Sequence, residues 1–173
     1  EIESNFTRNE NEVTKLAPGV DEIDIEAAFA SIGAYAIVGQ PFGAFYGTQW
    51  DRNAEGQLLI KANGLPQVAA TRGNLGNPYP DWTMGIRNIF SFYGFTINGL
   101  LDIREGGDLW NGTYARLNRF GTTQESADGR NQTYVIPGVK IADGTPNNIP
   151  ISANSYFSNY VGDSGSAATE QAI

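Results

Sequence analysis

Three acidic side chains lie close together in the second half of the chain and are the first candidates for chemistry. They are Asp102, Glu105 and Asp108, with Arg104 among them. A pair of carboxylates held at a fixed separation hydrolyses glycosidic bonds, one as the acid and the other as the base or nucleophile. These residues also flank a Gly-Gly pair, where a chain turns, so a solvated loop rim accounts for them without chemistry. We therefore expect no enzyme, and a carboxylate hydrolase is the alternative if two acids share one cleft.

A second set of acids and amides partly imitates a calcium-binding loop. Asp51, Asn53 and Glu55 alternate before Gly56, as oxygen ligands do at the start of such a loop. The twelfth position is Ala62, where a bidentate Glu is required. A hairpin turn explains the same Asn, Asp and Gly content. We therefore expect a turn here and no cofactor, with calcium as the alternative.

The composition excludes several kinds of chemistry. The 173 residues include no His and no Cys, which removes imidazole catalysis, thiolate nucleophiles, disulfides and ordinary zinc sites. The net charge is −8, from 19 acidic and 11 basic residues. Because the basic residues are scattered, a phosphate backbone is repelled, and we expect no nucleic-acid partner.

Four aromatic residues are candidates for binding a sugar. An aromatic ring offers apolar area with a polar handle, and a sugar ring can stack on it. Loop packing, or an aromatic girdle at a membrane interface, explains the same residues. The predicted substrate-binding residues are Tyr46, Trp50, Trp110 and Tyr114.

The clearest structural pattern lies at 82–104, where apolar residues alternate with polar ones on both sides of Tyr93-Gly94. This period of two predicts two strands joined by a two-residue turn. The turn places Phe92 opposite Phe95 and Asn88 opposite Gly99, and a slip by one residue would scatter the apolar set. The apolar face, predicted to contact lipid, consists of Met84, Ile86, Phe90, Phe92, Phe95, Ile97, Leu101 and Ile103.

The lengths of these elements favour a membrane. Each predicted strand has about ten residues, enough to cross a hydrocarbon layer when tilted, whereas strands of soluble sandwiches usually have about five or six. The tight turn at one end contrasts with long segments at 9–81 and 105–173 at the other. Outer-membrane barrels have this asymmetry of short periplasmic turns and long external loops. We expect an all-β, antiparallel transmembrane β-barrel segment, with its hairpin at 82–104.

Other segments are less regular. Residues 1–8 read as the end of a strand, and 37–46 as a packed loop. Residues 21–32 offer one helix-length apolar run closed by Gly33, and the sequence leaves open whether that run is helical. The sequence starts without a Met and ends at Ile173 without a cap, so we expect the chain to be a fragment of one β-barrel domain.

Six phrases, in this order and spacing, resemble the C-terminal barrel of SusC/RagA-type TonB-dependent outer-membrane transporters. The succession is more specific than any single phrase, and it extends over nearly the whole chain. The phrases lie at 39–47 (GQPFGAFYG), 75–82 (LGNPYPDW), 88–102, 106–111 (GGDLWN), 134–139 (YVIPGV) and 149–151 (IPI).

The resemblance implies a bacterial outer-membrane barrel of about 22 strands, of which this chain supplies one hairpin and its external loops. It implies import of glycans or peptides, a SusD-like surface lipoprotein as a lid, and TonB acting through regions outside this chain, including an absent plug domain. Its partners would then be that lipoprotein, an oligosaccharide or peptide ligand and outer-membrane lipid. The alternative is a soluble, secreted all-β carbohydrate-binding module, which also explains the acidity and the aromatic residues.

Overall fold

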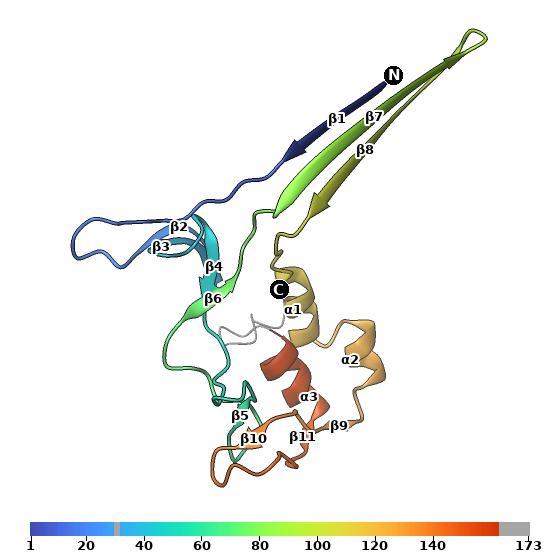
Figure 1. The fold of residues 1–173 in the computed structure, drawn as a ribbon. Helices are drawn as coiled ribbons and strands as arrows, with labels where there is room; N and C mark the ends of the chain where they lie inside the picture. Colours follow the sequence, from blue (N-terminus) through green and yellow to red (C-terminus); the bar gives the residue numbers. More distant parts are fainter. Residues whose placement is uncertain (30–31, 163–173) are drawn as a thin grey trace.

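The computed structural model describes residues 1–29 and 32–162, and Figure 1 shows three parts. A long three-stranded sheet projects from the rest of the molecule, a four-stranded sheet lies at its base, and a lobe with short helices lies beyond. Most regular elements are strands, which confirms the all-β prediction at this level. The described residues form no closed barrel.

The three-stranded sheet consists of β1 (Ile2–Thr7), β7 (Trp82–Phe92) and β8 (Phe95–Glu105), paired antiparallel in the order β1-β7-β8. The predicted hairpin is confirmed, because Phe92 pairs with Phe95 and Asn88 with Gly99. Both turn residues have positive φ, 44° at Tyr93 and 81° at Gly94, as in a type I′ turn. The predicted strand at 1–8 is confirmed as β1.

The register assigns the side chains of β1 to the two faces of the hairpin. Ile2 pairs with Asn88, and Phe6 with Met84, so both add to the apolar face. Glu3 pairs with Arg87 on the opposite face, where their side chains meet at 3.5 Å. Arg87 also donates to Asn98 at 3.3 Å, so polar side chains interact across all three strands of this face.

The four-stranded sheet has the antiparallel order β2-β3-β4-β6, and its members are β2 (Glu22–Phe29), β3 (Ile32–Ile37), β4 (Ala44–Gly47) and β6 (Gly73–Gly76). Within 21–32, residues 22–29 and Ile32 belong to strands, so the helical alternative for this run is wrong. The alternation of Glu22 and Asp24 with Ile23 and Ile25 carries the strand signal. The packed loop predicted at 37–46 shortens to 38–43, because β4 pairs between its two neighbours.

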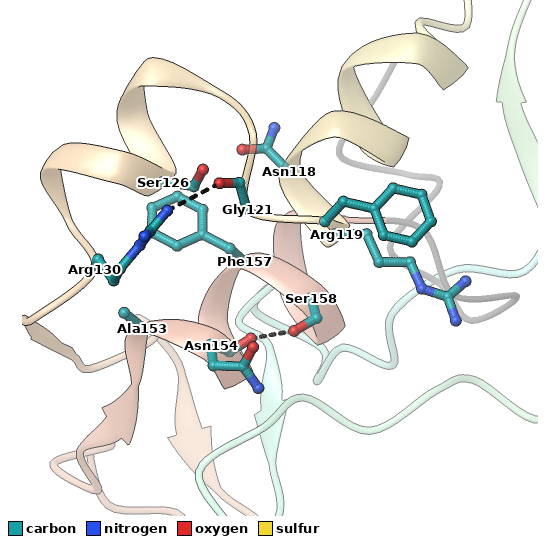
Figure 2. A pocket seen from close by; sticks show the side chains of 10 residues that line it. Asn118, Arg119, Gly121, Ser126, Arg130, Ala153, Asn154, Phe157 and Ser158 are labelled. Carbon is teal, nitrogen blue, oxygen red and sulfur yellow. Dashed lines mark hydrogen bonds between the residues drawn. The ribbon is translucent and has the colours of Figure 1, made fainter.

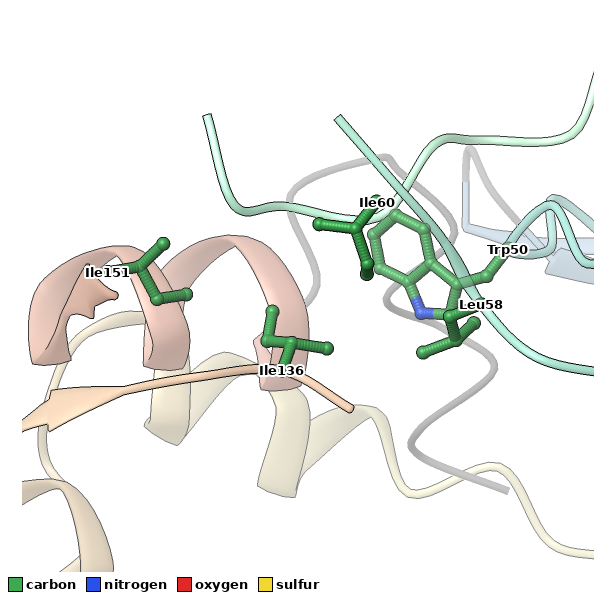
Figure 3. Close-up of a cluster of buried hydrophobic side chains, with 5 residues drawn as sticks. All are labelled: Trp50, Leu58, Ile60, Ile136 and Ile151. Atoms are coloured by element: carbon green, nitrogen blue, oxygen red, sulfur yellow. The ribbon is translucent and has the colours of Figure 1, made fainter. Parts of the chain in front are cut away.

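The distal lobe comprises residues 48–72 and 111–162, which belong to two segments predicted as separate external loops. The parallel pairing of β5 (Leu59–Ile60) with β10 (Val139–Lys140) joins them. β9 (Thr133–Tyr134) pairs antiparallel with β11 (Ile151–Ser152). Figure 3 shows the core that they enclose, made of Trp50, Leu58, Ile60, Ile136 and Ile151.

Short helices that the sequence analysis missed complete the lobe. α1 (Gly112–Arg119) begins at Asn111, whose side chain accepts from the Tyr114 N–H, and α2 (Gln124–Asp128) begins at Thr123, which caps Ser126. Such caps satisfy the first free N–H groups of a helix. α3 (Ala153–Tyr156) continues into the π-helical turn η1 (Phe157–Val161). Over the described ranges, no helix has the length and apolarity needed to span a membrane.

Candidate functional site

Two neighbouring cavities lie where β1 ends and β7 begins. Their volumes are about 450 and 420 Å³. They share five lining residues, and we call the two cavities together the rim cleft. The shared residues are Asn9, Asn11, Tyr79, Pro80 and Trp82.

Backbone contacts hold the two walls of the rim cleft. The Phe42 N–H donates to Oδ1 of Asn11 at 2.8 Å, which ties the segment after β1 to the β3–β4 connection. Val13 and Gln40 extend this contact through a backbone hydrogen bond of 2.9 Å. The Tyr79 N–H donates to Asn77, which fixes the turn before β7. Sequence segments far apart in the chain thus meet at the cleft.

The rim cleft exposes aromatic surface beside amide groups. Phe42 and Tyr79 are 50% and 43% exposed. Phe6 stacks on Trp82 with ring centroids 5.8 Å apart and planes 28° apart. Aromatic rings offer apolar faces for stacking, while the Asn9 and Asn11 amides can donate and accept hydrogen bonds. This combination can bind a hydroxyl-rich ligand.

The two cavities of the rim cleft share Trp82 and differ in the strand residues that line only one of them. The cavity of about 450 Å³, which we call the inner cavity, adds Thr7 and Thr83, which pair with each other on the polar face. The cavity of about 420 Å³ is called the outer cavity. The outer cavity adds Phe6, which lies on the apolar face with Met84. The alternation along the strands was enough to predict which face each strand residue lies on. The sequence did not show that residues 41–42 and 77–80 would fold against the strand ends.

The four aromatic residues predicted to bind substrate lie in three environments. Trp50 is 4% exposed and belongs to the lobe core, in ring contact with Tyr160. Tyr46 is half-buried in β4, where the Arg72 guanidinium lies 5.3 Å from the centre of its ring. Trp110 and Tyr114 lie at the start of α1. Their role in substrate binding stays a prediction.

The Arg72 guanidinium is held by several partners on the four-stranded sheet. It lies 4.5 Å from the centre of the Tyr35 ring, donates to the Tyr46 carbonyl at 3.1 Å, and pairs with Glu22 at 3.4 Å. Cation–π contacts and hydrogen bonds of this kind fix a side chain in place. Arg72 therefore covers part of the Tyr46 ring that a sugar would need for stacking.

Tyr114 is instead part of a link between helices. Its hydroxyl donates to a carboxylate oxygen of Glu125 at 2.6 Å. That hydrogen bond, followed by burial, raises the pKa of Tyr114 above its usual value. The pKa of Tyr156 is also raised, mainly by burial and then by its neighbour Tyr134, whose ring stacks on it at 4.2 Å.

The residues predicted to contact lipid share one exposed face of β7 and β8. Phe90 and Ile97 are each 72% exposed, and Leu101 is 56% exposed. Phe92 and Phe95 are exposed near the turn, while Met84, Ile86 and Ile103 are half-buried. The described chain encloses none of this face in a core. Contact with lipid stays a prediction.

Two of the candidate acids lie in different settings. Asp102 lies in β8 opposite Gly85. The Asp108 carboxylate accepts from the Asn77 N–H at 2.7 Å, and the Asp108 N–H donates to the Asn77 carbonyl at 2.7 Å. Asp108 thus joins the chain before β7 to the chain after β8, which is a structural role.

The calcium-like segment folds as the predicted turn. The Asn53 side-chain oxygen accepts from the N–H groups of Gln57 and Glu55 at 2.8 and 3.2 Å, and Gly56 has a φ of 80°. Asp51 accepts from the Gln67 amide at 2.9 Å. Within residues 1–29 and 32–162, no cluster of three or more acids could hold a metal ion.

A further cavity of about 390 Å³ lies between α1, α2 and α3. Figure 2 shows Arg130 donating to the Gly121 carbonyl at 3.3 Å, and the Ser158 hydroxyl donating to the Asn154 carbonyl. Asn118 is fully buried and donates to the Tyr114 carbonyl at 3.1 Å. These hydrogen bonds all lie within the helices or join the turns after them, so we assign the polar walls of this cavity to the fold.

No family model matches the chain. Among known proteins, TonB-dependent receptor P3 of Formosa agariphila is 28% identical to it over 147 residues. The match covers 72% of this chain and 14% of the receptor, so the chain spans a small part of that relative's length. This chain is therefore distantly similar to part of a TonB-dependent receptor.

Proposed function

We propose that this chain is part of the wall and external loops of a TonB-dependent outer-membrane transporter of the SusC/RagA type. The observation that carries the proposal is the largely apolar, exposed face of β1, β7 and β8, which no described element covers. Large exposed apolar patches mark a surface that meets a partner or a membrane. The polar reverse face, with its Glu3–Arg87 pair and the hydrogen bond from Arg87 to Asn98, suits the water-filled side of a barrel wall.

The dimensions of the hairpin support this reading. β7 and β8 each have 11 residues. At about 3.3 Å per residue such a strand is roughly 36 Å long, and at a tilt of about 45° it spans roughly 25 Å. The apolar band of outer-membrane barrels has about this height.

Aromatic residues at both ends of the hairpin also support a membrane location. Tyr93 is 87% exposed and has a φ of 44°, although Asn or Gly would adopt this turn at lower cost. Its ring meets Phe92 edge-on at 4.4 Å, while Trp82 and Phe6 stack at the other end. Aromatic girdles at two membrane interfaces would account for both groups.

The proposed role of this chain in import is passive. Its strands form part of the barrel wall. The rim cleft and the distal lobe offer surfaces to a glycan or peptide ligand and to a SusD-like lipoprotein that acts as a lid. Energy coupling through TonB belongs to regions outside this chain. This proposal includes no catalytic step.

One adjacent pair of leucines tests the membrane location. Leu101 lies on the apolar face, and Leu100 lies opposite Arg87 on the polar face. We expect Leu101→Glu to lower the amount of protein in the outer-membrane fraction severalfold, since a charge in lipid costs about 1–3 kcal/mol. Leu100→Glu, which can pair with Arg87, is expected to leave that amount unchanged. Equal amounts for both variants would contradict the proposal.

A soluble carbohydrate-binding module is the second candidate, and the exposed Phe42 and Tyr79 of the rim cleft favour it. The two functions differ in their need for detergent. A module should stay monomeric in buffer, whereas a barrel segment with this apolar face should require detergent or lipid. Sedimentation of the protein with and without detergent separates the two.

A further inference from the structure

The outer cavity of the rim cleft lies where the apolar face of the three-stranded sheet ends. Its lining joins Phe6 and Trp82 from that face to Asn9, Asn77 and Tyr79 from the segments beyond the strands. One wall is therefore apolar and continuous with Met84, the pairing partner of Phe6. The other wall carries amide and phenol groups. An amphipathic ligand would contact both walls.

The charges that line the cavity restrict which polar group of an amphipathic ligand, its headgroup, can bind there. Arg8 forms an ion pair with Glu10, so these two lining charges cancel. Asp81 also lines the cavity and leaves one net negative charge. A phosphate or carboxylate headgroup would be repelled. A neutral, hydroxyl-rich headgroup suits the remaining amides, which both donate and accept hydrogen bonds.

On these grounds, and resting on the proposed membrane location, we propose that the outer cavity binds the sugar headgroup of a neutral glycolipid. The sugar lies against the aromatic pair of Phe6 and Trp82 and faces Asn9. The acyl chains continue along the apolar face past Met84. The inner cavity stays available to a soluble ligand, because two of the three residues that line it alone, Thr7 and Thr83, lie on the polar face, and the third is Phe42.

Lipid retention tests the inference. The protein is incorporated into phosphatidylethanolamine nanodiscs containing equal small amounts of digalactosyl diacylglycerol and phosphatidylglycerol, and bound lipids are counted by native mass spectrometry. We expect about three- to tenfold more galactolipid than phosphatidylglycerol to be retained, as one aromatic stack provides. Equal retention of the two lipids would overturn the inference.

Two phenylalanines provide a matched pair of variants. Phe6 lines only the outer cavity, and Phe42 lines only the inner cavity. Both side chains are exposed. Phe6→Ala is expected to abolish the galactolipid preference, and Phe42→Ala to preserve it. The opposite pattern, or displacement of the lipid by free digalactose, would show a site for soluble sugar and overturn the lipid assignment.

A third variant tests the charge argument. Asp81→Lys reverses the net charge of the lining, so the preference should shift toward phosphatidylglycerol; no shift would contradict the argument. Failure of the whole transporter that contains this chain to enter nanodiscs would instead count against the proposed transporter, which separates the two hypotheses.

Discussion

The hydrogen bond between Tyr114 and Glu125 shows how one residue can couple stability to pH. Because it favours the protonated phenol, the pKa of Tyr114 is higher in the folded state than in the unfolded chain. A raised folded-state pKa gives stability that is fully present below about pH 10, the unfolded value. That stability is lost as pH rises through the folded-state pKa.

We predict that Tyr114→Phe lowers the free energy of unfolding by about 0.5–1 kcal/mol at pH 7.5, since a half-exposed hydrogen bond is lost. The difference from the parent protein should shrink above pH 10, where Tyr114 ionises in the unfolded chain. Urea unfolding at the two pH values measures both quantities. Tyr93→Phe is the control, because the Tyr93 ring is exposed at the turn. A difference that stays constant with pH would refute this coupling.

At the scale of elements, the pairing of β5 with β10 requires the backbone at Gly138 to lie close to the backbone at Leu58. A Cβ added at Gly138 would lie 2.5 Å from the Leu58 carbonyl oxygen and 2.9 Å from a side-chain carbon of Ile60. We predict that Gly138→Ala costs about 1–3 kcal/mol, because the pairing must open to admit the methyl group. Gly99 in β8 has no atom within 4 Å of an added Cβ, so Gly99→Ala should be neutral or slightly stabilising. Chemical denaturation of the two variants measures the difference, and equal effects would contradict the prediction.

The elements differ in how far the sequence could predict them. The hairpin of β7 and β8 could be predicted with its register, because both signals are local: a period of two and a two-residue turn. The sequence of β2 also alternates, which favours a strand. Its pairing with β3 could not be predicted, because register shifts follow Asp24 and Glu26. α1 and α2 carry caps at Asn111 and Thr123, yet at 8 and 5 residues they are too short to be stable without tertiary contacts.

The candidate site was harder to predict for the same reason. An aromatic residue is a core residue or a binding residue according to what packs on it, and those partners are distant in sequence. Trp50 is buried in a cluster with Ile136 and Ile151, whereas Tyr79 is left partly exposed at the rim cleft. No local pattern distinguishes the two.

At the scale of the whole molecule, the two long segments behave as one folded unit. Leu58 and Ile60 from the first segment share a core with Ile136 and Ile151 from the second. The Val139 N–H donates to the Leu58 carbonyl at 2.9 Å, and the Ile141 N–H to the Ile60 carbonyl at 3.0 Å. A lobe built this way should open cooperatively, unlike two independent loops.

Amide hydrogen exchange tests this cooperativity. Ile136 is fully buried, so Ile136→Ala should cost about 2–5 kcal/mol in the lobe. Two amides of the first segment report on it: the Asp51 N–H donates to the Gln67 carbonyl, and the Gln67 N–H donates to the Leu59 carbonyl. We predict that the variant also speeds hydrogen exchange at these two amides. Leu109→Ala, at an exposed position, should leave these amides unchanged. If Ile136→Ala altered exchange in 111–162 alone, the two segments would be independent loops. The distal lobe could then not present the single rigid surface that a lid lipoprotein would need.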